Sequence, residues 1–309
     1  MFRALSRKTL ERIKYVWGTG CIWGGSQIQH WLQHPLVLER INLKVSGTAR
    51  KNRFEYFLER YLRGKMPVER ALTLGSGVGE LERGLCQYGF ARFHEGLDLS
   101  DEAVQIATQT AESAGFDHIR YRTADLNTVV LAGASYDVIF GVSSIHHVEN
   151  LEHLFSQVQR AIKPGGYFFL DEFVGPSRFQ WTDMQIQIMN EQLQQLPKHL
   201  RRLISDRAKF KERVIRKSLP YMAAADPSEA VRSSEIVPLL GEYFRILEIK
   251  GYGGAILHEL LYDIAGNFCE DNTGSLDCLR RLFETEDQLT ASQTIPDDFA
   301  VIIATSRAS

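Results

Sequence analysis

The chain has 309 residues, of which 44% are apolar and 24% charged, as in ordinary globular proteins. Its formal net charge of −2 argues against a general nucleic-acid-binding surface. The sequence contains no run of 18 apolar residues, the length that a membrane-spanning helix needs. The first residues lack the apolar core of a signal peptide, and the four cysteines lack Cys-x-x-Cys spacing. We therefore expect a cytoplasmic protein with neither a metal site nor a disulfide framework.

Residues 1–68 combine aromatic side chains with interrupted helical periodicity. Phe54, Phe57 and Tyr61 recur at helical spacing, which predicts a helix packed on the domain that follows. Glycines at positions 18, 20, 24 and 25 argue against a continuous helix through the part of the chain in which they lie. We expect an N-terminal helical arm that serves either for packing or as a lid.

A glycine-rich turn follows the first predicted strand. The apolar run Ala71–Leu74 leads into Gly75, Gly77 and Gly79, and a helical pattern then covers Gly79–Tyr88. Glycines allow a ligand to approach the backbone closely, and free N–H groups at a helix N-terminus attract negative charge. Because glycines also form ordinary turns, this motif alone does not separate a binding site from a simple turn.

The second predicted strand, Phe93–Asp98, ends in an acidic residue. Asp98 lies 23 positions after Gly75, where a carboxylate at the tip of the second strand can accept hydrogen bonds from both ribose hydroxyls of a nucleoside. The glycines are spaced G-x-G-x-G, not in the dinucleotide-binding spacing G-x-G-x-x-G. This combination resembles the class I S-adenosylmethionine-dependent methyltransferases. The resemblance implies that Gly75, Ser76, Gly77 and Gly79 wrap the amino-acid end of S-adenosylmethionine, and that Asp98 with Leu99 holds the ribose; the product would be S-adenosylhomocysteine.

Strands and helices continue to alternate up to Asp171, which predicts a parallel sheet with right-handed crossovers. Beyond Asp171 the alternation breaks, and residues 178–240 are expected to be largely helical. Two late apolar runs match the antiparallel strands that end the family's seven-stranded sheet. The further predicted strands are Ile119–Thr123, Tyr136–Val142, Tyr167–Leu170, Phe244–Ile249 and Phe299–Thr305, and the helices between them are Asp101–Ala114 and Leu151–Ile162.

The resemblance thus implies an α/β fold with a doubly wound, mostly parallel seven-stranded sheet of the Rossmann-like methyltransferase type. Residues 69–309 would form this domain, after the arm or lid of residues 1–68. Helical insertions at about 172–242 and 255–292 would lie at the carboxyl edge of the sheet, where open α/β sheets bind ligands. We expect these insertions to form a lid over the acceptor pocket.

The match to the family is specific over residues 69–172. The resemblance places Asp125, in Thr123-Ala-Asp-Leu-Asn127, at the adenine amino group with Leu126 beside the ring; alternatively, Asp125 only caps a turn. It also places Gly141 and Val142, at the end of the fourth strand, beside the methionine portion of the cofactor.

His146 and His147 follow the fourth strand, at the edge where an acceptor should approach. A histidine titrates near neutral pH and can accept the acceptor's proton, although paired histidines can also simply fix a loop. Glu172 and its neighbour Asp171 are competing carboxylates just beyond the fifth strand, and His258 is a third option.

Residues 198–217 contain nine cations and two acids, a balance of +7. One interpretation is a solvated helix face with apolar residues turned inward. The other is attraction of an anionic acceptor or a membrane surface. The cations are Lys198, Arg201, Arg202, Arg207, Lys209, Lys211, Arg213, Arg216 and Lys217.

The sequence therefore favours methyl transfer from S-adenosylmethionine to a small molecule, by preference a hydroxyl of a sugar or secondary metabolite. One alternative is a non-catalytic interaction module that keeps the cofactor fold. Another is a methyltransferase acting on nucleic acid, which the missing Asn/Asp-Pro-Pro-aromatic motif after the fourth strand disfavours. No nucleic-acid partner is expected, and a homodimer is compatible with the sequence.

Overall fold

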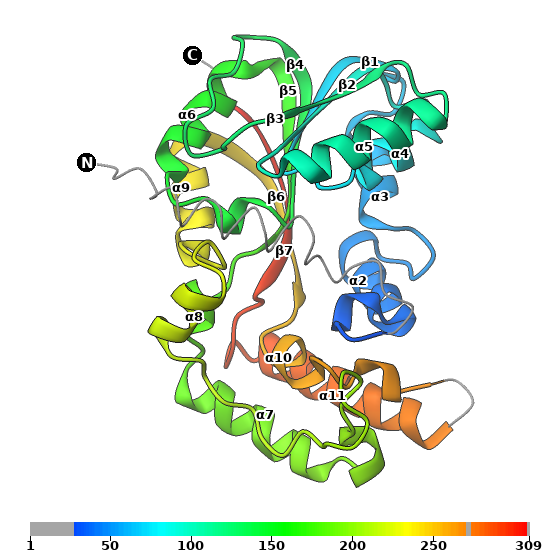
Figure 1. Cartoon of the computed structure of the whole chain (residues 1–309), viewed down its shortest axis with the longest axis vertical. Helices are drawn as coiled ribbons and strands as arrows, with labels where there is room; N and C mark the ends of the chain where they lie inside the picture. The colour runs from blue at the N-terminus through cyan, green and yellow to red at the C-terminus, as the bar shows by residue number, and fades with distance from the viewer. Residues whose placement is uncertain (1–27, 270–272, 308–309) are drawn as a thin grey trace.

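A computed structural model describes residues 28–269 and 273–307. They form a seven-stranded sheet in the order β3-β2-β1-β4-β5-β7-β6, in which β7 runs antiparallel to both neighbours and the first five strands are parallel (Figure 1). The predicted sheet is thereby confirmed. Its strands are β1 (Val68–Leu74), β2 (Ala91–Asp98), β3 (Ile119–Thr123), β4 (Tyr136–Val142), β5 (Ile162–Phe173), β6 (Phe244–Gly253) and β7 (Phe299–Ser306).

Helices cover both faces of the sheet because its central strands are apolar on both sides. Ala71 and Phe140 pack in the cluster that contains α3 and α4, whereas Leu72 and Ile139 pack in the cluster that contains α6 and α9. The α-helices are α2 (Pro35–Ser46), α3 (Arg53–Tyr61), α4 (Glu80–Cys86), α5 (Asp101–Ser113), α6 (Leu151–Ala161), α7 (Asp183–Gln195), α8 (Leu219–Ala225), α9 (Ile236–Tyr243), α10 (Leu257–Leu261) and α11 (Thr273–Ala291).

The order of the strands reverses between β1 and β4. β2 and β3 follow β1 outward on one side, and β4 lies on its other side. The loops after β1 and β4 therefore leave the sheet in opposite directions, which opens a crevice at its carboxyl edge. This is the edge on which the predicted site residues lie.

The described part of the N-terminal arm packs firmly on the domain. The predicted helix is present as α3, which begins with a capping box between Asn52 and Glu55. Phe57 is fully buried, and its ring contacts those of Phe140 and Phe169. These contacts agree with the packing interpretation for residues 28–68; the aromatic residues at positions 15, 17 and 23 lie outside the described residues.

The region after β5 is less helical than predicted. Residues 202–217 form neither a helix nor a strand apart from an isolated bridge between Arg202 and Phe210, and only Lys198–Arg201 forms a short 3-10 helix, η5. The solvated helix face proposed for the basic run is therefore wrong. The main chain bonds to distant partners instead: the Ile204 N–H donates to Asp263 O and the Val214 N–H to Asn190 Oδ1.

Some predicted element ends also shift. The strand expected to begin at Tyr167 begins at Ile162, because the Lys-Pro-Gly-Gly turn is absorbed into β5 as a change of register against β4. Figure 1 shows α7, α10 and α11 gathered at one end of the molecule, next to β6 and β7. α9 instead packs with α6 on a face of the sheet. Within the described residues, none of the helices has the length and apolarity needed to cross a bilayer.

Candidate functional site

The glycine turn joins the end of β1 to α4. The N–H groups of Gly75 and Ser76 both donate to Leu97 O at 2.8 Å, so the turn is tied to β2. Gly75 has φ of +74°, and a Cβ at this position would lie 2.4 Å from Ser144 Cβ. Only glycine satisfies both the left-handed backbone and this close approach. The turn is thus packed directly against the loop after β4.

Asp98 holds the turn from the tip of β2. One oxygen, Oδ2, accepts the Gly77 N–H at 2.8 Å, and the other, Oδ1, accepts the Ser100 N–H at 2.8 Å. Burial raises the pKa of Asp98 above its ordinary value, and these backbone donors oppose the rise. The carboxylate that was predicted to hold a ribose therefore lies beside the glycine turn, with backbone donors on both oxygens.

Asp125 lies at the neighbouring strand end, two residues after β3. The Ala124 N–H donates to Asp98 O at 2.8 Å, which joins the two strand ends. Asp125 Oδ1 accepts both the backbone N–H and the side-chain amide of Asn127 at 2.9 Å. Asp125 thus stabilises its own turn, as the alternative interpretation expected. Leu126 follows it half-buried, and the adenine contact stays a prediction.

The end of β4 completes this part of the edge. Gly141 is paired with Leu74 of β1 and Val142 with Asp171 of β5. Gly141 is buried, and a Cβ there would meet the side chain of Ile145 at 2.6 Å. The predicted methionine side of the site is therefore next to the glycine turn.

His146 lies on the short 3-10 helix η3 (Ile145–His147) and is fixed by Glu172 at the end of β5. Its Nδ1 lies 2.6 Å from Glu172 Oε2. The other oxygen of Glu172 accepts the N–H groups of Ser144 and Ile145, both at 2.6 Å. Glu172 is completely buried, so it reaches no acceptor and positions the imidazole. The sequence named both residues as candidates, but their contact with each other is visible only in the fold.

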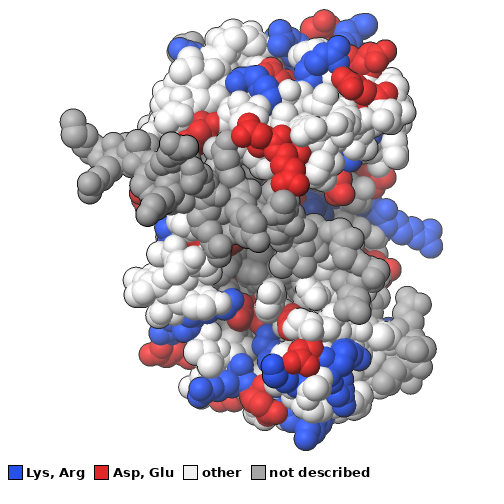
Figure 2. Space-filling model, in the orientation of Figure 1, with Lys and Arg blue, Asp and Glu red and all other residues white. Residues whose placement is uncertain are grey.

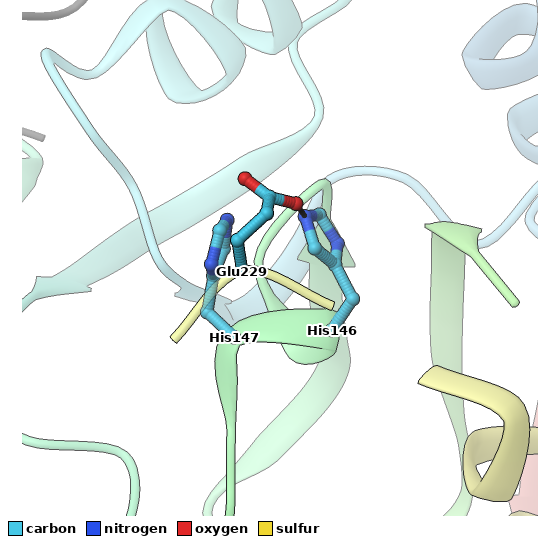
Figure 3. Close-up of side chains that lie close together, drawn as sticks. All are labelled: His146, His147 and Glu229. Atoms are coloured by element: carbon cyan, nitrogen blue, oxygen red, sulfur yellow. Dashed lines mark ion pairs between the residues drawn. The ribbon is translucent and has the colours of Figure 1, made fainter. Parts of the chain in front are cut away.

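Glu229 is a site residue that the sequence reasoning missed. It lies in the loop after α8, and its carboxylate reaches between the rings of His146 and His147 (Figure 3). Its Oε1 is 3.6 Å from His146 Nε2. The loop is fixed by a bond from the Val231 N–H to His146 O at 3.1 Å. The stretch Asp226-Pro-Ser-Glu229 carries no motif that would have pointed to this position.

The groups of this cluster have shifted proton affinities. Burial works against a charged His146, but the carboxylates of Glu172 and Glu229 outweigh it and raise the pKa of His146. Burial raises the pKa of Glu229 to about 7, against the pull of His146. Burial, with His146 as a neighbour, holds the pKa of His147 well below its ordinary value. Opposite shifts of neighbouring groups are typical of functional sites, and they make this cluster a candidate for proton transfer.

The two remaining candidates serve other purposes. Asp171 forms an ion pair with Arg53 of α3 and accepts the Tyr252 hydroxyl at 2.7 Å, so it ties the arm to the sheet. His258 lies in an aromatic cluster, where its ring contacts Phe173 and Trp181. Burial holds the pKa of His258 well below its ordinary value. Neither residue contacts the His146 side chain.

The cations of the basic run contact different parts of the fold. Figure 2 shows Lys and Arg mixed with Asp and Glu at both ends of the molecule. Several cations of the run have structural partners: Arg216 donates to Trp181 O, Lys211 to Glu259 O, and Lys209 pairs with Asp206. Electrostatic attraction of a ligand by this run stays a prediction.

The chain was compared with known proteins. A model of the methyltransferase domain matches residues 72–170. The sterol 24-C-methyltransferase of Yarrowia lipolytica is 31% identical over 123 residues, which cover 40% of this chain and 32% of that protein. The ubiquinone biosynthesis O-methyltransferase of Rhizobium etli is 27% identical over 106 residues, which cover 34% of this chain and 42% of that protein. The match thus spans less than half the length of either relative.

A solved structure is similar over the whole chain. It is geranyl diphosphate C-methyltransferase from Streptomyces coelicolor A3(2), determined with Mg²⁺, geranyl diphosphate and S-adenosyl-L-homocysteine. The TM-score is 0.57 at 14% identity, and the alignment covers 99% of this chain and 100% of that one. At this identity the likeness concerns the fold alone.

Proposed function

We propose that this protein binds S-adenosylmethionine and transfers its methyl group to a small molecule, because residues 72–170 match a model of the methyltransferase domain. The observation that carries the proposal is the contact between the two halves of the site. Ser144 packs against Gly75, its hydroxyl donates to Leu74 O at 2.6 Å, and its own N–H donates to Glu172. A cofactor on the glycine turn would therefore lie next to the His146 cluster.

The residues at the turn suit the cofactor that the family uses. Ser76 Oγ is buried and has no hydrogen-bond partner among the described residues, and a Cβ on Gly77 would meet nothing within 4 Å. The Ser76 hydroxyl and the open space beside Gly77 are therefore available to a ligand. Asp98 can accept hydrogen bonds from ribose hydroxyls through its remaining lone pairs. Gly75, Ser76, Gly77, Gly79, Asp98, Leu99, Asp125, Leu126, Gly141 and Val142 are the proposed cofactor contacts.

The acceptor would approach the cluster of His146, His147 and Glu229. When bound, S-adenosylmethionine supplies an electrophilic methyl, to which the acceptor forms a bond while the carbon–sulfur bond breaks and its electron pair stays on sulfur. The protein must align the acceptor and, for a hydroxyl, help remove its proton. Glu172 keeps a proton on His146 Nδ1, so that Nε2 faces the acceptor side next to Glu229.

This arrangement favours O-methylation, because a proton acceptor near neutral pH suits a hydroxyl group. In the metal-free protein, His146 Nε2 and Glu229 are the groups that can take the hydroxyl proton. Acceptors in the two relatives compared above are small molecules, namely a sterol and a precursor of ubiquinone by their names. We propose a hydroxylated metabolite as the acceptor class.

Calorimetric titration of the full-length protein with S-adenosylmethionine and with S-adenosylhomocysteine tests the cofactor part. One cofactor per chain is expected, with much weaker binding in Asp98→Ala. A screen of hydroxylated metabolites, read out as release of S-adenosylhomocysteine, then tests the acceptor class. Absence of binding by both nucleosides would overturn the enzymatic proposal, because the turn would then serve structure only.

A further inference from the structure

Two imidazoles and a carboxylate converge at the edge of the site. His146 and His147 are consecutive on η3, and Glu229 comes from the loop after α8 (Figure 3). One nitrogen or oxygen atom from each residue lies within 4.8 Å of the other two. The imidazole centroids are 4.1 Å apart. Within residues 28–269 and 273–307, this is the one cluster of histidine, cysteine and acidic side chains with metal-ligand spacing.

The hydrogen bonds behind the rings fix which nitrogen of each histidine carries the proton. Glu172 accepts two backbone N–H groups and therefore also accepts from His146 Nδ1, so that in the neutral imidazole Nε2 carries the lone pair. Ser228 donates its hydroxyl proton to Asp226 Oδ1 at 2.7 Å, so its oxygen accepts from His147 Nδ1 at 3.2 Å. Metal-binding histidines are oriented in this way, with the far nitrogen donating to a carboxylate or hydroxyl.

Among the described residues, Glu229 has no Lys or Arg within ion-pair distance, although Lys217 and Arg178 act on its carboxylate from farther away. It accepts no hydrogen bond from the described residues, and its closest ionisable partner is His146 Nε2 at 3.6 Å. A carboxylate in such surroundings gains from a neighbouring cation. Its side chain keeps 20% of its surface exposed, so the cluster is not sealed from small ligands.

We propose that His146, His147 and Glu229 bind a divalent transition-metal ion, with Glu172 and Ser228 orienting the two imidazoles. Two imidazoles and one carboxylate suit Zn²⁺, Co²⁺, Mn²⁺, Fe²⁺ or Ni²⁺ better than Mg²⁺ or Ca²⁺, which prefer oxygen ligands. Three protein ligands leave coordination positions open.

The use of this ion rests on the proposed function. An acceptor hydroxyl bound at an open position would be held next to the cofactor turn, and the cation would lower its pKa. His146 Nε2 is then a ligand, so in the metal-loaded protein the hydroxyl proton leaves to solvent water.

The test uses full-length, tag-free protein freed of metal with a chelator. Titration with Co²⁺, followed by visible absorption, and with Zn²⁺, followed by calorimetry, should give one ion per chain. Glu229→Gln and His147→Ala should each weaken binding about 10–100-fold, and His199→Ala, which removes an exposed histidine outside the cluster, should not. Affinity should fall as the pH drops below 7, because ligand protonation competes with the ion.

Lack of saturable binding, or binding that Glu229→Gln leaves unchanged, would overturn the metal proposal. The same preparations are titrated with S-adenosylmethionine. Cofactor binding without metal binding rejects the metal site and keeps the methyltransferase. Metal binding without cofactor binding keeps the metal site and rejects the proposed methyltransferase function. Glu229→Gln replaces only one oxygen of a partly exposed side chain by an amide nitrogen. It therefore still tests the proposal if His147→Ala fails to fold.

Discussion

The cofactor half and the acceptor half of the site differ in how they are built. In the proposed cofactor half, backbone groups make most of the internal contacts, and the contact from the Gly77 N–H to Asp98 joins residues 21 positions apart. In the acceptor half, side chains meet from three separate segments. His146 is bonded to Glu172, 26 positions away, and lies against Glu229 from the distant loop after α8. The residues of the first half that contact each other are close in the sequence. Those of the second half come from distant segments and meet only when the chain folds.

This difference has a functional consequence. A turn built from backbone can serve any member of a family that binds the same nucleoside, because it depends little on side chains. A cluster of side chains brought together by an insertion can change with every acceptor. We therefore expect variants in the two halves to separate cofactor binding from acceptor chemistry.

The largest expected effect is that of Glu172→Gln in the acceptor half. An amide cannot accept from both Ser144 and His146 as the carboxylate does, so the imidazole loses its orientation and its preferred tautomer. Turnover of an acceptor found by screening should fall about 10²–10⁴-fold, with cofactor affinity nearly unchanged. Without Glu172, the pKa of His146 should fall, which NMR titration of the imidazole can follow.

Glu242→Gln is the matched control, because Glu242 is an exposed carboxylate on α9. If the Glu172→Gln protein turns over at the normal rate and its imidazole titration is unshifted, His146 does not need the Glu172 carboxylate for its orientation.

Asp98→Ala should produce the converse result in the cofactor half. The variant loses a charge-assisted contact to the ribose and the bond to the Gly77 N–H, at a cost on the order of 1.5–3 kcal/mol. Cofactor affinity should therefore fall about 10–150-fold, as measured by calorimetry. Asp117→Ala, in the exposed turn before β3, should bind normally. Equal affinities for the two variants would remove the ribose role from Asp98.

The same contrast explains what the sequence could predict. The strand–turn–helix pattern at Gly75, the acid at Asp98 and the two histidines are local signals, and each is found where it was expected. The parallel direction of the first five strands followed from the alternation of strands and helices, because a helix that connects two strands of one sheet brings them side by side in the same direction. Glu172 could be placed at the rim, because it directly follows a predicted strand.

Glu229 and Ser228 could not be predicted, because their position depends on a long-range bond from Val231 to His146 O. The basic run was misread as a helix for a related reason. Its apolar residues have helix-like spacing, but its main-chain groups bond to α7 and to the loop at Asp263. Tertiary hydrogen bonds of this kind leave no periodic trace in the sequence.

A stability measurement can sharpen the description of the cofactor half. Glu82 of α4 is completely buried, and burial raises the pKa of its carboxyl to about 7. Because the folded-state pKa lies above the unfolded-state value, the free energy of unfolding should decrease as the pH rises from about 4.5 through about 7. Glu82→Gln should therefore stabilise the protein at pH 8 by on the order of 2–3 kcal/mol, and little at pH 4.5.

Urea denaturation at the two pH values measures this effect. Glu80→Gln, at the exposed start of the same helix, should change stability by less than about 0.5 kcal/mol at either pH. If Glu82→Gln does not raise the free energy of unfolding at pH 8, neighbouring groups must stabilise the ionised carboxylate of Glu82.

The smallest expected effect lies in the basic run of residues 198–217, and it separates cations with structural partners from exposed ones. Lys211 donates to Glu259 O at 2.6 Å and to Tyr262 O at 2.9 Å, and burial lowers the pKa of Lys211 to about 8. Lys211→Ala loses both bonds but also relieves a buried charge, so we expect a loss of only about 1 kcal/mol and a fall in Tm of about 2 °C near pH 7. The difference should widen as the pH rises from 8 toward 10.5, because the wild-type folded state then holds a neutral amine. Lys209→Ala removes an exposed cation of the same loop and should leave the Tm unchanged. If both variants melt alike, the two carbonyl contacts of Lys211 add nothing measurable to stability, and Lys211 belongs with the exposed cations.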